Sequence, residues 1–318
     1  MKSKVWLVGA GVMAQDYFKV LKALGEEPLV IGRSQKSVED FKLATQHTAM
    51  GGGLEAFLET GPGVPSFAIV SVSRETLSDV TCRLLSYGIK NILVEKPAGL
   101  SMQEIDNIVQ VKKDAKVLIG FNRHFYASVQ KAKELILEDG GVQSFSFEFT
   151  EWSHKLKDLV SVKGEKVMRT WFLGNSIHVA DLAFYLGGLP QKISTYVKGG
   201  LDWHPNSSVF AGAGISNRGA LFSYQANWES AGRWGVEFMT AHRRIILRPL
   251  EELHIQKKGA ISIEKVELDH SVDFQCKPGL YQQVKSFLDG EMSEFSDIED
   301  LKNIFPVYLE MAGYGDLL

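Results

Sequence analysis

A glycine-rich turn between an apolar run and a helical pattern constrains the start of this chain more than any other feature. Residues 9–14 read Gly-Ala-Gly-Val-Met-Ala, directly after the apolar run Lys4–Val8 and at the start of a helical pattern over Met13–Leu24. In a G-x-G-x-x-A turn the first glycine permits the tight bend, the second lets a pyrophosphate approach the backbone, and the small sixth residue allows close helix–strand packing. The helix N-terminus adds free N–H donors and a positive dipole end. The sequence therefore predicts a dinucleotide site here.

The same alternation of short apolar runs and helical patterns continues to about residue 121. We expect further strands at 28–31, 67–72, 91–94 and 116–120, and helices at 38–44, 75–87 and 101–113. Strands that alternate with helices predict a parallel sheet with helices on its two faces. The glycine-rich stretches 51–53 and 61–63 are expected to be loops.

The pattern changes near residue 122. A chain of 318 residues exceeds what one hydrophobic core usually serves. We therefore expect a dinucleotide-binding Rossmann domain at 1–121 and an α+β domain for substrate binding and oligomerisation at 122–318. The expected elements of the second domain are a helix at 128–137, a strand at 142–152, successive strands over 191–269 that predict a largely antiparallel sheet, and helices at 280–288 and 298–311. The last helix is expected to pack back on the first domain.

Composition excludes several classes of protein. With 45% hydrophobic and 23% charged residues and a net charge of −3, the chain has no general attraction to nucleic acid or anionic membrane. The basic run at 242–244 is expected on a solvated sheet face, and no stretch is long and apolar enough to span a membrane. Cys82 and Cys276 show neither metal-site spacing nor a disulfide framework, so we expect no metal and a cytoplasmic location.

The residues after the second expected strand bear on which dinucleotide binds. NAD-preferring sites usually place an acidic side chain about 20 residues past the glycines, where it contacts the ribose hydroxyls. This chain has Arg33 and Ser34 there. A guanidinium and a hydroxyl suit a 2′-phosphate, which an aspartate would repel. The sequence thus predicts NADP in preference to NAD, and the alternative is that Arg33 is a solvated loop residue.

A Glu-Lys-Pro turn closes the strand at 91–94. The proline that follows Lys96 restricts the lysine backbone to extended conformations. Ligands of such folds bind at the carboxyl ends of the strands, where an ammonium group can hydrogen-bond a substrate hydroxyl and stabilise a developing alkoxide. The alternative is an ordinary surface lysine.

A third element, Asn175–Leu182, is expected to begin a helix. His178 and Asp181 are three residues apart and so share one face of it. A histidine is a suitable acid or base for an alcohol proton, and Asp181 can orient the ring or contact substrate. The alternative is that both residues only serve to start the helix.

The glycine turn, the Glu-Lys-Pro turn and the pair His178 and Asp181 are accompanied by Asn122-Arg123 and by Tyr185 to Gly188. In order and spacing, these motifs resemble the Gfo/Idh/MocA family of oxidoreductases over most of the chain. The resemblance implies a Rossmann domain followed by a large, open, mainly antiparallel sheet, often with a cis Lys-Pro peptide. It implies hydride transfer between NAD(P) and a CH–OH or carbonyl carbon of a sugar, sugar nucleotide or cyclic polyol. It also implies a homo-oligomer, a dimer or tetramer, formed through the open sheet face.

The expected site residues follow from these motifs. The catalytic residues are Lys96, His178 and Asp181. The expected cofactor-binding residues are Gly9, Gly11, Val12, Met13, Arg33, Ser34, Ser71, Ser73, Glu95, Lys96, Pro97 and Asn122. The expected substrate-binding residues are Lys96, Arg123, Trp152, Arg169, Asn175 and His178. Further candidates, at positions more typical of loop or packing residues, are His154, Lys155, Lys157 and Trp171.

One position departs from the family pattern. Family dehydrogenases often carry an aspartate four residues before the histidine, and this chain has Gly174 there. Asn175 can offer a hydrogen bond but cannot act as a base. Two alternatives to a sugar dehydrogenase therefore stay open: a non-catalytic NAD(P)-binding regulator or scaffold of the same fold, and a reductase of a non-sugar carbonyl or imine.

Overall fold

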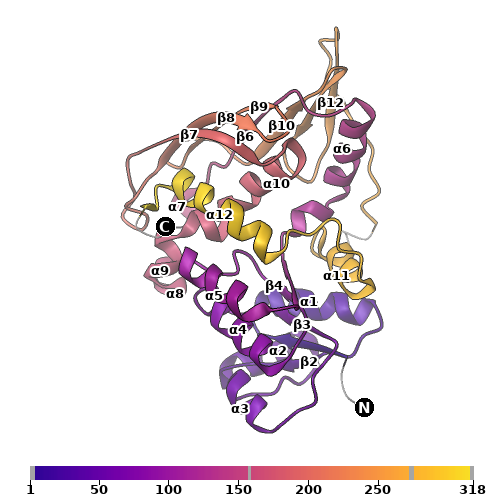
Figure 1. Cartoon of the computed structure of the whole chain (residues 1–318), viewed down its shortest axis with the longest axis vertical. Helices are drawn as coiled ribbons and strands as arrows, with labels where there is room; N and C mark the ends of the chain where they lie inside the picture. Colours follow the sequence, from indigo (N-terminus) through magenta and orange to yellow (C-terminus); the bar gives the residue numbers. More distant parts are fainter. Residues whose placement is uncertain (1–3, 157–158, 272–275, 316–318) are drawn as a thin grey trace. The chain divides into compact units, whose positions relative to one another are not determined.

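The computed structural model describes residues 4–156, 159–271 and 276–315 (Figure 1). The chain divides into two compact units that are not consecutive in sequence. The first unit comprises the residues up to Asn122 together with Ser271–Asn303, and the second comprises Arg123–His270 together with the residues from Ile304 onward. The helix α12 (Ile298–Ala312) contributes to both.

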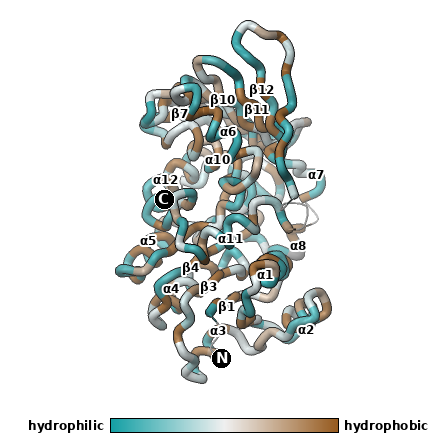
Figure 2. Tube along the Cα trace, turned by 90° about the vertical axis from the view of Figure 1, so that its right-hand side faces the viewer, coloured by the Kyte–Doolittle hydropathy of each residue, from teal (hydrophilic) through white to brown (hydrophobic). Residues whose placement is uncertain are grey.

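The first unit contains a parallel five-stranded sheet in the order β2-β1-β3-β4-β5. Its strands are β1 (Val5–Val8), β2 (Leu29–Ile31), β3 (Phe67–Val70), β4 (Asn91–Val94) and β5 (Lys116–Ile119). Its helices before residue 126 are α1 (Val12–Ala23), α2 (Gln35–Thr45), α3 (Gly53–Glu59), η1 (Arg74–Thr76), α4 (Leu77–Tyr87), α5 (Met102–Lys112) and η2 (Asn122–Phe125), the last continuing into the second unit. The strands are short apolar runs (Figure 2) and mostly buried, as expected of a parallel sheet covered on its faces. The expected Rossmann architecture is confirmed.

Both edges of this sheet are covered by short backbone pairings. Next to β2, Met50 forms a parallel bridge with Ile31, and its carbonyl accepts a 2.7 Å hydrogen bond from Gly32. Next to β5, Asp297 forms an antiparallel bridge with Leu118. An exposed strand edge is a template for pairing with other chains, so these pairings protect the sheet.

The segment 271–303 returns to the first unit through α11 (Leu280–Asp289). Leu280, Val284 and Phe287 lie on one face of this helix at helical spacing and join the buried core that contains Tyr17 of α1. The core of the first unit therefore needs a helix that lies far along the chain.

The helix α3 was not predicted from the sequence, because its flanking glycines at 51–53 and 61–63 are typical of loops. Its buried residues Leu54 and Phe57 are three apart, and the ring of Phe57 packs edge-on against Trp6 at 4.9 Å. Two apolar anchors on one face are enough to hold this short helix on the sheet.

The second unit contains an eight-stranded sheet in the order β13-β12-β11-β10-β6-β9-β8-β7. Its strands are β6 (Ser144–Glu148), β7 (Pro190–Lys198), β8 (Val209–Ser216), β9 (Leu221–Asn227), β10 (Gly235–Met239), β11 (Arg243–Leu247), β12 (His254–Lys257) and β13 (Glu264–Lys265). Among the described strands of this second sheet, only the pair β6 and β9 is parallel. The expected large, mainly antiparallel sheet is confirmed.

One face of this sheet is covered by α10 (Ile177–Gly187). Alternate residues of β6, Phe145 and Phe147, are buried and pack edge-on against Phe184 of the helix. A Cβ atom on Gly187 would lie 2.5 Å from the Phe145 ring, so the helix approaches the sheet closely. This packing fixes α10, which carries His178 and Asp181. The other helices of the second unit are α6 (Ala127–Glu138), α7 (Ser153–Leu156), α8 (Val160–Lys163), α9 (Glu165–Arg169) and the π-helical turn η4 (Phe172–Ser176).

The opposite face of the sheet is open. It holds a shallow depression of about 830 Å³ that is lined by small and polar side chains, among them Ser146, Ser194 and Ser223. Tyr196 lies on this face with 71% of its surface exposed. Polar residues alternate here with the buried aromatic ones, which is the pattern of a sheet with one packed face.

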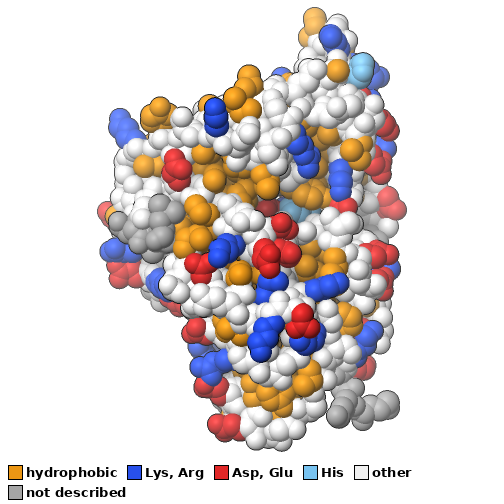
Figure 3. All heavy atoms as spheres, viewed as in Figure 1, with side chains coloured by type: hydrophobic (Ala, Val, Ile, Leu, Met, Phe, Trp, Pro, Cys, Tyr) orange, Lys and Arg blue, Asp and Glu red, His pale blue; other side chains and the backbone are white. Residues whose placement is uncertain are grey.

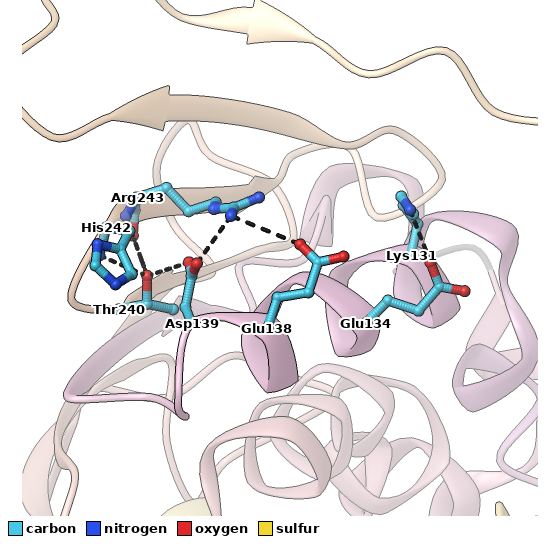
Figure 4. Close-up of polar contacts among 7 residues, drawn as sticks. All are labelled: Lys131, Glu134, Glu138, Asp139, Thr240, His242 and Arg243. Carbon is cyan, nitrogen blue, oxygen red and sulfur yellow. Dashed lines mark hydrogen bonds and ion pairs between the residues drawn. The ribbon is translucent and has the colours of Figure 1, made fainter.

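Two residues of the basic run at 242–244, Arg243 and Arg244, form ion pairs. Asp139, at the end of α6, accepts hydrogen bonds from Thr240 at 2.6 Å and Arg243 at 2.8 Å, and Glu138 lies 3.6 Å from the same guanidinium (Figure 4). Arg244 pairs with Glu237 of β10. Acidic and basic side chains are interspersed on the face shown in Figure 3. No helix in the described ranges has the length and hydropathy needed to cross a bilayer.

Candidate active site

The turn between β1 and α1 requires glycine at its first position. Gly9 has φ +126°, and a Cβ atom there would lie 2.1 Å from the carbonyl oxygen of Ser71 at the end of β3. Its N–H donates to the carbonyl of Ile31 at 2.8 Å, so the turn is held between the two neighbouring strands. Any side chain at position 9 would push β3 away.

The second glycine of the turn has open space around it. Gly11 is the N-cap residue of α1, no side chain caps the helix, and a Cβ atom on Gly11 would meet nothing within 4 Å. The next residue, Val12, is 75% exposed. Beside the turn, the hydroxyl of Ser71 is buried without a hydrogen-bond partner among the described residues. Uncapped helix donors, open space and an unused hydroxyl fit a pyrophosphate group.

The residues expected near the ribose have unequal surroundings. Ser34 caps α2, because its hydroxyl accepts a 3.2 Å hydrogen bond from the N–H of Ser37. Arg33 is exposed directly before it. Ser73 is also exposed, and its hydroxyl lies 3.0 Å from that of Thr76. Of the three residues, Arg33 is the only one that carries a charge, and Ser34 is the one whose side chain caps a helix.

The Glu-Lys-Pro turn follows β4. The Lys96–Pro97 peptide is cis, as the family resemblance implied, and the N–H of Ala98 donates to the carbonyl of Glu95 at 3.0 Å. Lys96 is half-buried. The carboxylate of Glu95 accepts a 2.7 Å hydrogen bond from Tyr17 of α1. Burial and the nearby Glu95 charge raise the pKa of the Tyr17 hydroxyl, which stays a protonated donor that anchors the turn.

The segment 271–303 contributes contacts that were not predicted from the sequence. Asn122 is buried and its side-chain amide donates to the carbonyl of Pro278 at 2.9 Å. Lys277 places its ammonium 2.7 Å from the sulfur of Met13 and 3.9 Å from Asp16, both in the first part of α1. A cation beside the helix N-terminus adds to the positive character of this region.

In the second unit, Arg123 lies against His178. A guanidinium nitrogen of Arg123 is 2.8 Å from Nε2 of the His178 ring. A guanidinium can only donate hydrogen bonds, so Nε2 is the acceptor and a neutral ring carries its proton on Nδ1. His178 itself is 3% exposed.

Asp181 pairs with a different histidine. Its Oδ2 lies 2.6 Å from Nε2 of His124, and its Oδ1 accepts a 3.5 Å hydrogen bond from Tyr308. The His124 ring stacks on Tyr185 with 3.9 Å between ring centroids. The sequence pattern does not reveal this network, because His124 lies far upstream of α10. Asp181 is thus engaged away from the ring of His178.

A buried carboxyl group lies next to the turn that precedes His178. Glu151 accepts hydrogen bonds from Asn175 at 2.9 Å and from Ser176 at 2.7 Å, both residues of η4. Burial raises the pKa of Glu151, and the hydrogen bonds from Ser176 and Asn175 oppose this shift. Gly174, where the family often has an aspartate, lies buried in the same turn. Sequence reasoning missed Glu151, because only the fold brings it to η4.

Cations and indoles alternate near His178. We use the name cation–indole ladder for Lys155, Trp152, Arg233, Trp234 and Arg123. Lys155 and Arg233 lie 4.3 Å and 4.7 Å from the Trp152 ring, and Arg233 and Arg123 lie 4.5 Å and 5.6 Å from the Trp234 ring. The ring of Trp234 is 6.3 Å from that of His178. Arg233 and Trp234 were not predicted, since they come from the loop before β10.

Four other candidates lie outside this ladder or outside the described residues. Arg169 is exposed and pairs with Glu165 at 2.6 Å on α9. Trp171 is buried in the core. His154 is exposed on α7, and Lys157 lies outside the described residues. Among the described residues, no group of three or more potential ligands is placed to hold a metal ion.

The first unit, with its parallel sheet, glycine turn and open helix N-terminus, is an NAD-binding Rossmann domain. Residues 3–122 match the model of the "oxidoreductase family, NAD-binding Rossmann fold". Within this domain the match confirms the resemblance to the Gfo/Idh/MocA oxidoreductases that is seen in the motifs at 9–14 and 95–97.

Solved structures extend the likeness to the whole chain. UDP-N-acetylglucosamine 3-dehydrogenase from Acidithiobacillus ferrooxidans is 14% identical with a TM-score of 0.73, over 99% of this chain and 98% of its own. Levoglucosan dehydrogenase in complex with NADH and levoglucosan is 14% identical with a TM-score of 0.77, over 99% and 97%. A protein described as an NADPH-dependent oxidoreductase from Desulfitobacterium hafniense is 18% identical with a TM-score of 0.75, over 98% and 95%. At these identities the likeness establishes the shared two-part fold. A search of curated proteins gave no match.

Proposed function

We propose that this chain is an NAD(P)-dependent oxidoreductase that transfers a hydride between the cofactor and a CH–OH or carbonyl carbon of a sugar, sugar nucleotide or cyclic polyol. The observation that carries the proposal is the β1–α1 turn, where Gly9 is sterically required and Gly11 leaves open space at an uncapped helix N-terminus. The Gfo/Idh/MocA match of the same residues supports it. Two solved neighbours, named as a sugar-nucleotide dehydrogenase and a sugar dehydrogenase, support the substrate class.

The proposed cofactor contacts are divided between the turn and the strand ends. The backbone at 9–13 and the hydroxyl of Ser71 would hold the pyrophosphate. Arg33, with Ser34 beside it, would contact a ribose 2′-phosphate, and we therefore propose NADP as the preferred cofactor. The name of the Desulfitobacterium hafniense neighbour includes NADPH, which supports this choice. Ser73, Glu95, Pro97 and Asn122 are proposed to border the nicotinamide half.

The bound dinucleotide would supply the carbon that donates or accepts the hydride. We propose that His178 moves the proton of the reacting hydroxyl through Nε2, the atom that now accepts from Arg123. The substrate hydroxyl would take the place of Arg123 at Nε2, and the guanidinium would then donate to the substrate oxygen. Lys96 would donate a further hydrogen bond to that oxygen and stabilise its negative charge.

The remaining proposed residues support this chemistry. Asp181 is proposed as a positioning residue, because its carboxylate is engaged by His124 and Tyr308. Trp152 and Asn175 are proposed as substrate contacts next to the ladder. Arg169 is also proposed as a substrate contact, for which its guanidinium would have to leave Glu165.

A second candidate is a non-catalytic dinucleotide-binding regulator or scaffold. Gly174 in place of the usual aspartate favours it, and so does the engagement of Asp181 by His124. A third candidate is the reduction of a non-sugar carbonyl or imine, which would use the same proposed cofactor-binding and catalytic residues with another substrate. Oxidation of NADPH or NADH in the presence of any carbonyl substrate excludes the non-catalytic candidate.

The experiment that tests the proposed function is a turnover assay with NADP⁺ and NAD⁺ against a panel of sugars, sugar acids, sugar nucleotides and cyclic polyols. The substitutions Lys96→Ala and His178→Ala are each expected to lower turnover by at least about a hundredfold. Both variants should largely retain NADPH binding. Turnover near the wild-type value in either variant would refute the role proposed for that residue.

We also propose that the chain forms a homo-oligomer in which a second copy covers the open sheet face. The face belongs to a sheet of eight described strands, and Tyr196 and Leu221 are exposed on it by 71% and 59%. A dimer is the smallest assembly that covers it, and a tetramer would use a further surface. The chain has two cysteines, Cys82 and Cys276, whose spacing shows no disulfide framework, and we propose a reducing cytoplasm as the location.

A further inference from the structure

Two cations of the cation–indole ladder, Lys155 and Arg233, have no role in the proposed proton transfer. Three cations, Lys155, Arg233 and Arg123, alternate with Trp152 and Trp234. The end of the ladder at Lys155 is exposed, and the end at Arg123 hydrogen-bonds to His178. A neutral sugar would need no such row of positive charges beside the reacting hydroxyl.

The guanidinium of Arg233 is held in place and keeps its donors available. It lies between the rings of Trp152 and Trp234, and its side chain is 43% exposed. The nearest carboxylate oxygen among the described residues, on Glu151, is 3.7 Å away, which is longer than a hydrogen bond. A planar guanidinium fixed in this way matches the geometry of a carboxylate or phosphate group.

The carboxyl group of Glu151 is engaged by other donors. It accepts hydrogen bonds from Asn175 and Ser176, while the guanidinium of Arg233 lies 3.7 Å away, beyond hydrogen-bond distance. Trp234 supplies a second donor. It is 7% exposed, and its indole N–H is buried with no hydrogen-bond partner among the described residues. A buried donor without an acceptor is unfavourable unless a ligand supplies one.

We propose that the substrate of this site is anionic: a sugar derivative whose carboxylate or phosphate group binds Arg233 and the neighbouring ladder residues while its reacting hydroxyl lies at His178. The inference rests on the proposed function and narrows its substrate class. Neutral hexoses and cyclic polyols would then bind weakly, because they leave the guanidinium of Arg233 and the indole N–H of Trp234 without an acceptor.

Binding is measured by calorimetry on the full-length protein saturated with NADPH, with D-glucuronate, D-glucose 6-phosphate and D-glucose as probes. At least one of the two anions should bind about tenfold more tightly than D-glucose. Tighter binding of D-glucuronate would identify the carboxylate as the preferred group, and tighter binding of D-glucose 6-phosphate would identify the phosphate. In Arg233→Gln this preference should fall to within about twofold. Lys131→Gln, which removes an exposed cation of α6 that pairs with Glu134, should keep the wild-type preference.

Equal affinity for the neutral and anionic sugars overturns the proposal, and so does the absence of detectable binding by all three. An unchanged preference in Arg233→Gln also overturns it. If that variant does not fold, Lys155→Gln at the exposed end of the ladder is measured instead, and an anion affinity at least about threefold weaker is expected. NADPH binding without sugar is recorded separately, so that loss of the cofactor site is distinguished from loss of the anion preference.

Discussion

The Nε2 atom of His124 lies 2.6 Å from Oδ2 of Asp181, and the neighbouring residue Arg123 lies 2.8 Å from the ring of His178. Two consecutive residues of η2 thus pair with two residues that are one turn apart on α10. The pair formed by His124 and Asp181 is buried, so it can fix Arg123 at the ring of His178 without contacting substrate. We infer that Asp181 acts through position.

The substitution Asp181→Asn tests this inference. It leaves His124 without a carboxylate partner, so the free energy of unfolding should fall by about 1–3 kcal/mol. Turnover should fall less than in His178→Ala, because the proposed proton carrier remains. The measurements are urea unfolding and steady-state kinetics on both variants. A variant of unchanged stability that is as inactive as His178→Ala would show that Asp181 takes part in the chemistry directly.

Arg33 should decide the choice of cofactor. Arg33→Gln removes the proposed cation for a 2′-phosphate, so the affinity for NADPH is expected to fall by about tenfold or more. The affinity for NADH should change by less than about twofold, which makes NADH the internal control. Fluorescence titration with both dinucleotides measures this. Equal affinity of the wild-type protein for NADPH and NADH would remove the proposed preference.

His204 should make the stability of the second unit sensitive to acid. Its Nδ1 lies 2.6 Å from the carbonyl oxygen of Ser207, and burial lowers the pKa of the ring from 6.5 to about 4. Below pH 6.5 the histidine of the unfolded chain binds a proton, whereas the folded ring stays unprotonated until about pH 4. The free energy of unfolding therefore decreases as the pH falls from 6.5 to about 4. Between pH 7 and pH 5 the loss should be about 2 kcal/mol.

The comparison for His204 is His204→Phe, which cannot titrate. Its unfolding free energy is expected to be lower than that of the wild-type protein at pH 7 but to change less between pH 7 and pH 5. Equal pH dependence of the two proteins in urea titrations would show that another group controls the acid sensitivity.

The open sheet face should mediate self-association. Tyr196→Glu places a charge on the exposed part of β7, so the variant is expected to sediment as a smaller species than the wild-type protein at the same concentration. Leu137→Glu is the matched control, since Leu137 is 70% exposed on α6 and away from that face. A wild-type protein that sediments as a monomer would contradict the proposed assembly.

Local sequence was sufficient for much of the first unit. The glycine turn and the Glu-Lys-Pro turn are marked by short sequence motifs, and the strand ends follow from the alternation of strands and helices. The fold of the second unit was also predictable in outline, because its strands alternate buried and exposed residues. The single parallel pair of β6 and β9 was not, since pairing between distant strands leaves no mark in either strand.

The partners of the site residues were less predictable, for a physical reason. His124, Glu151 and Arg233 reach α10 and η4 only through the packing of the second unit, and their own neighbours in sequence show no motif. The return of α11 to the first unit is hidden in the same way, because an amphipathic helix does not specify which surface covers its apolar face.

The central claim is that the β1–α1 turn binds the pyrophosphate of a dinucleotide, and Gly11→Val tests it most directly. A Cβ atom at position 11 would meet no heavy atom within 4 Å, so the variant should fold with a melting temperature close to that of the wild-type protein. The valine side chain would occupy the space proposed for the pyrophosphate, so affinity for both NADPH and NADH should fall by at least about a hundredfold. A folded Gly11→Val protein that binds either dinucleotide as tightly as the wild-type protein would contradict the account.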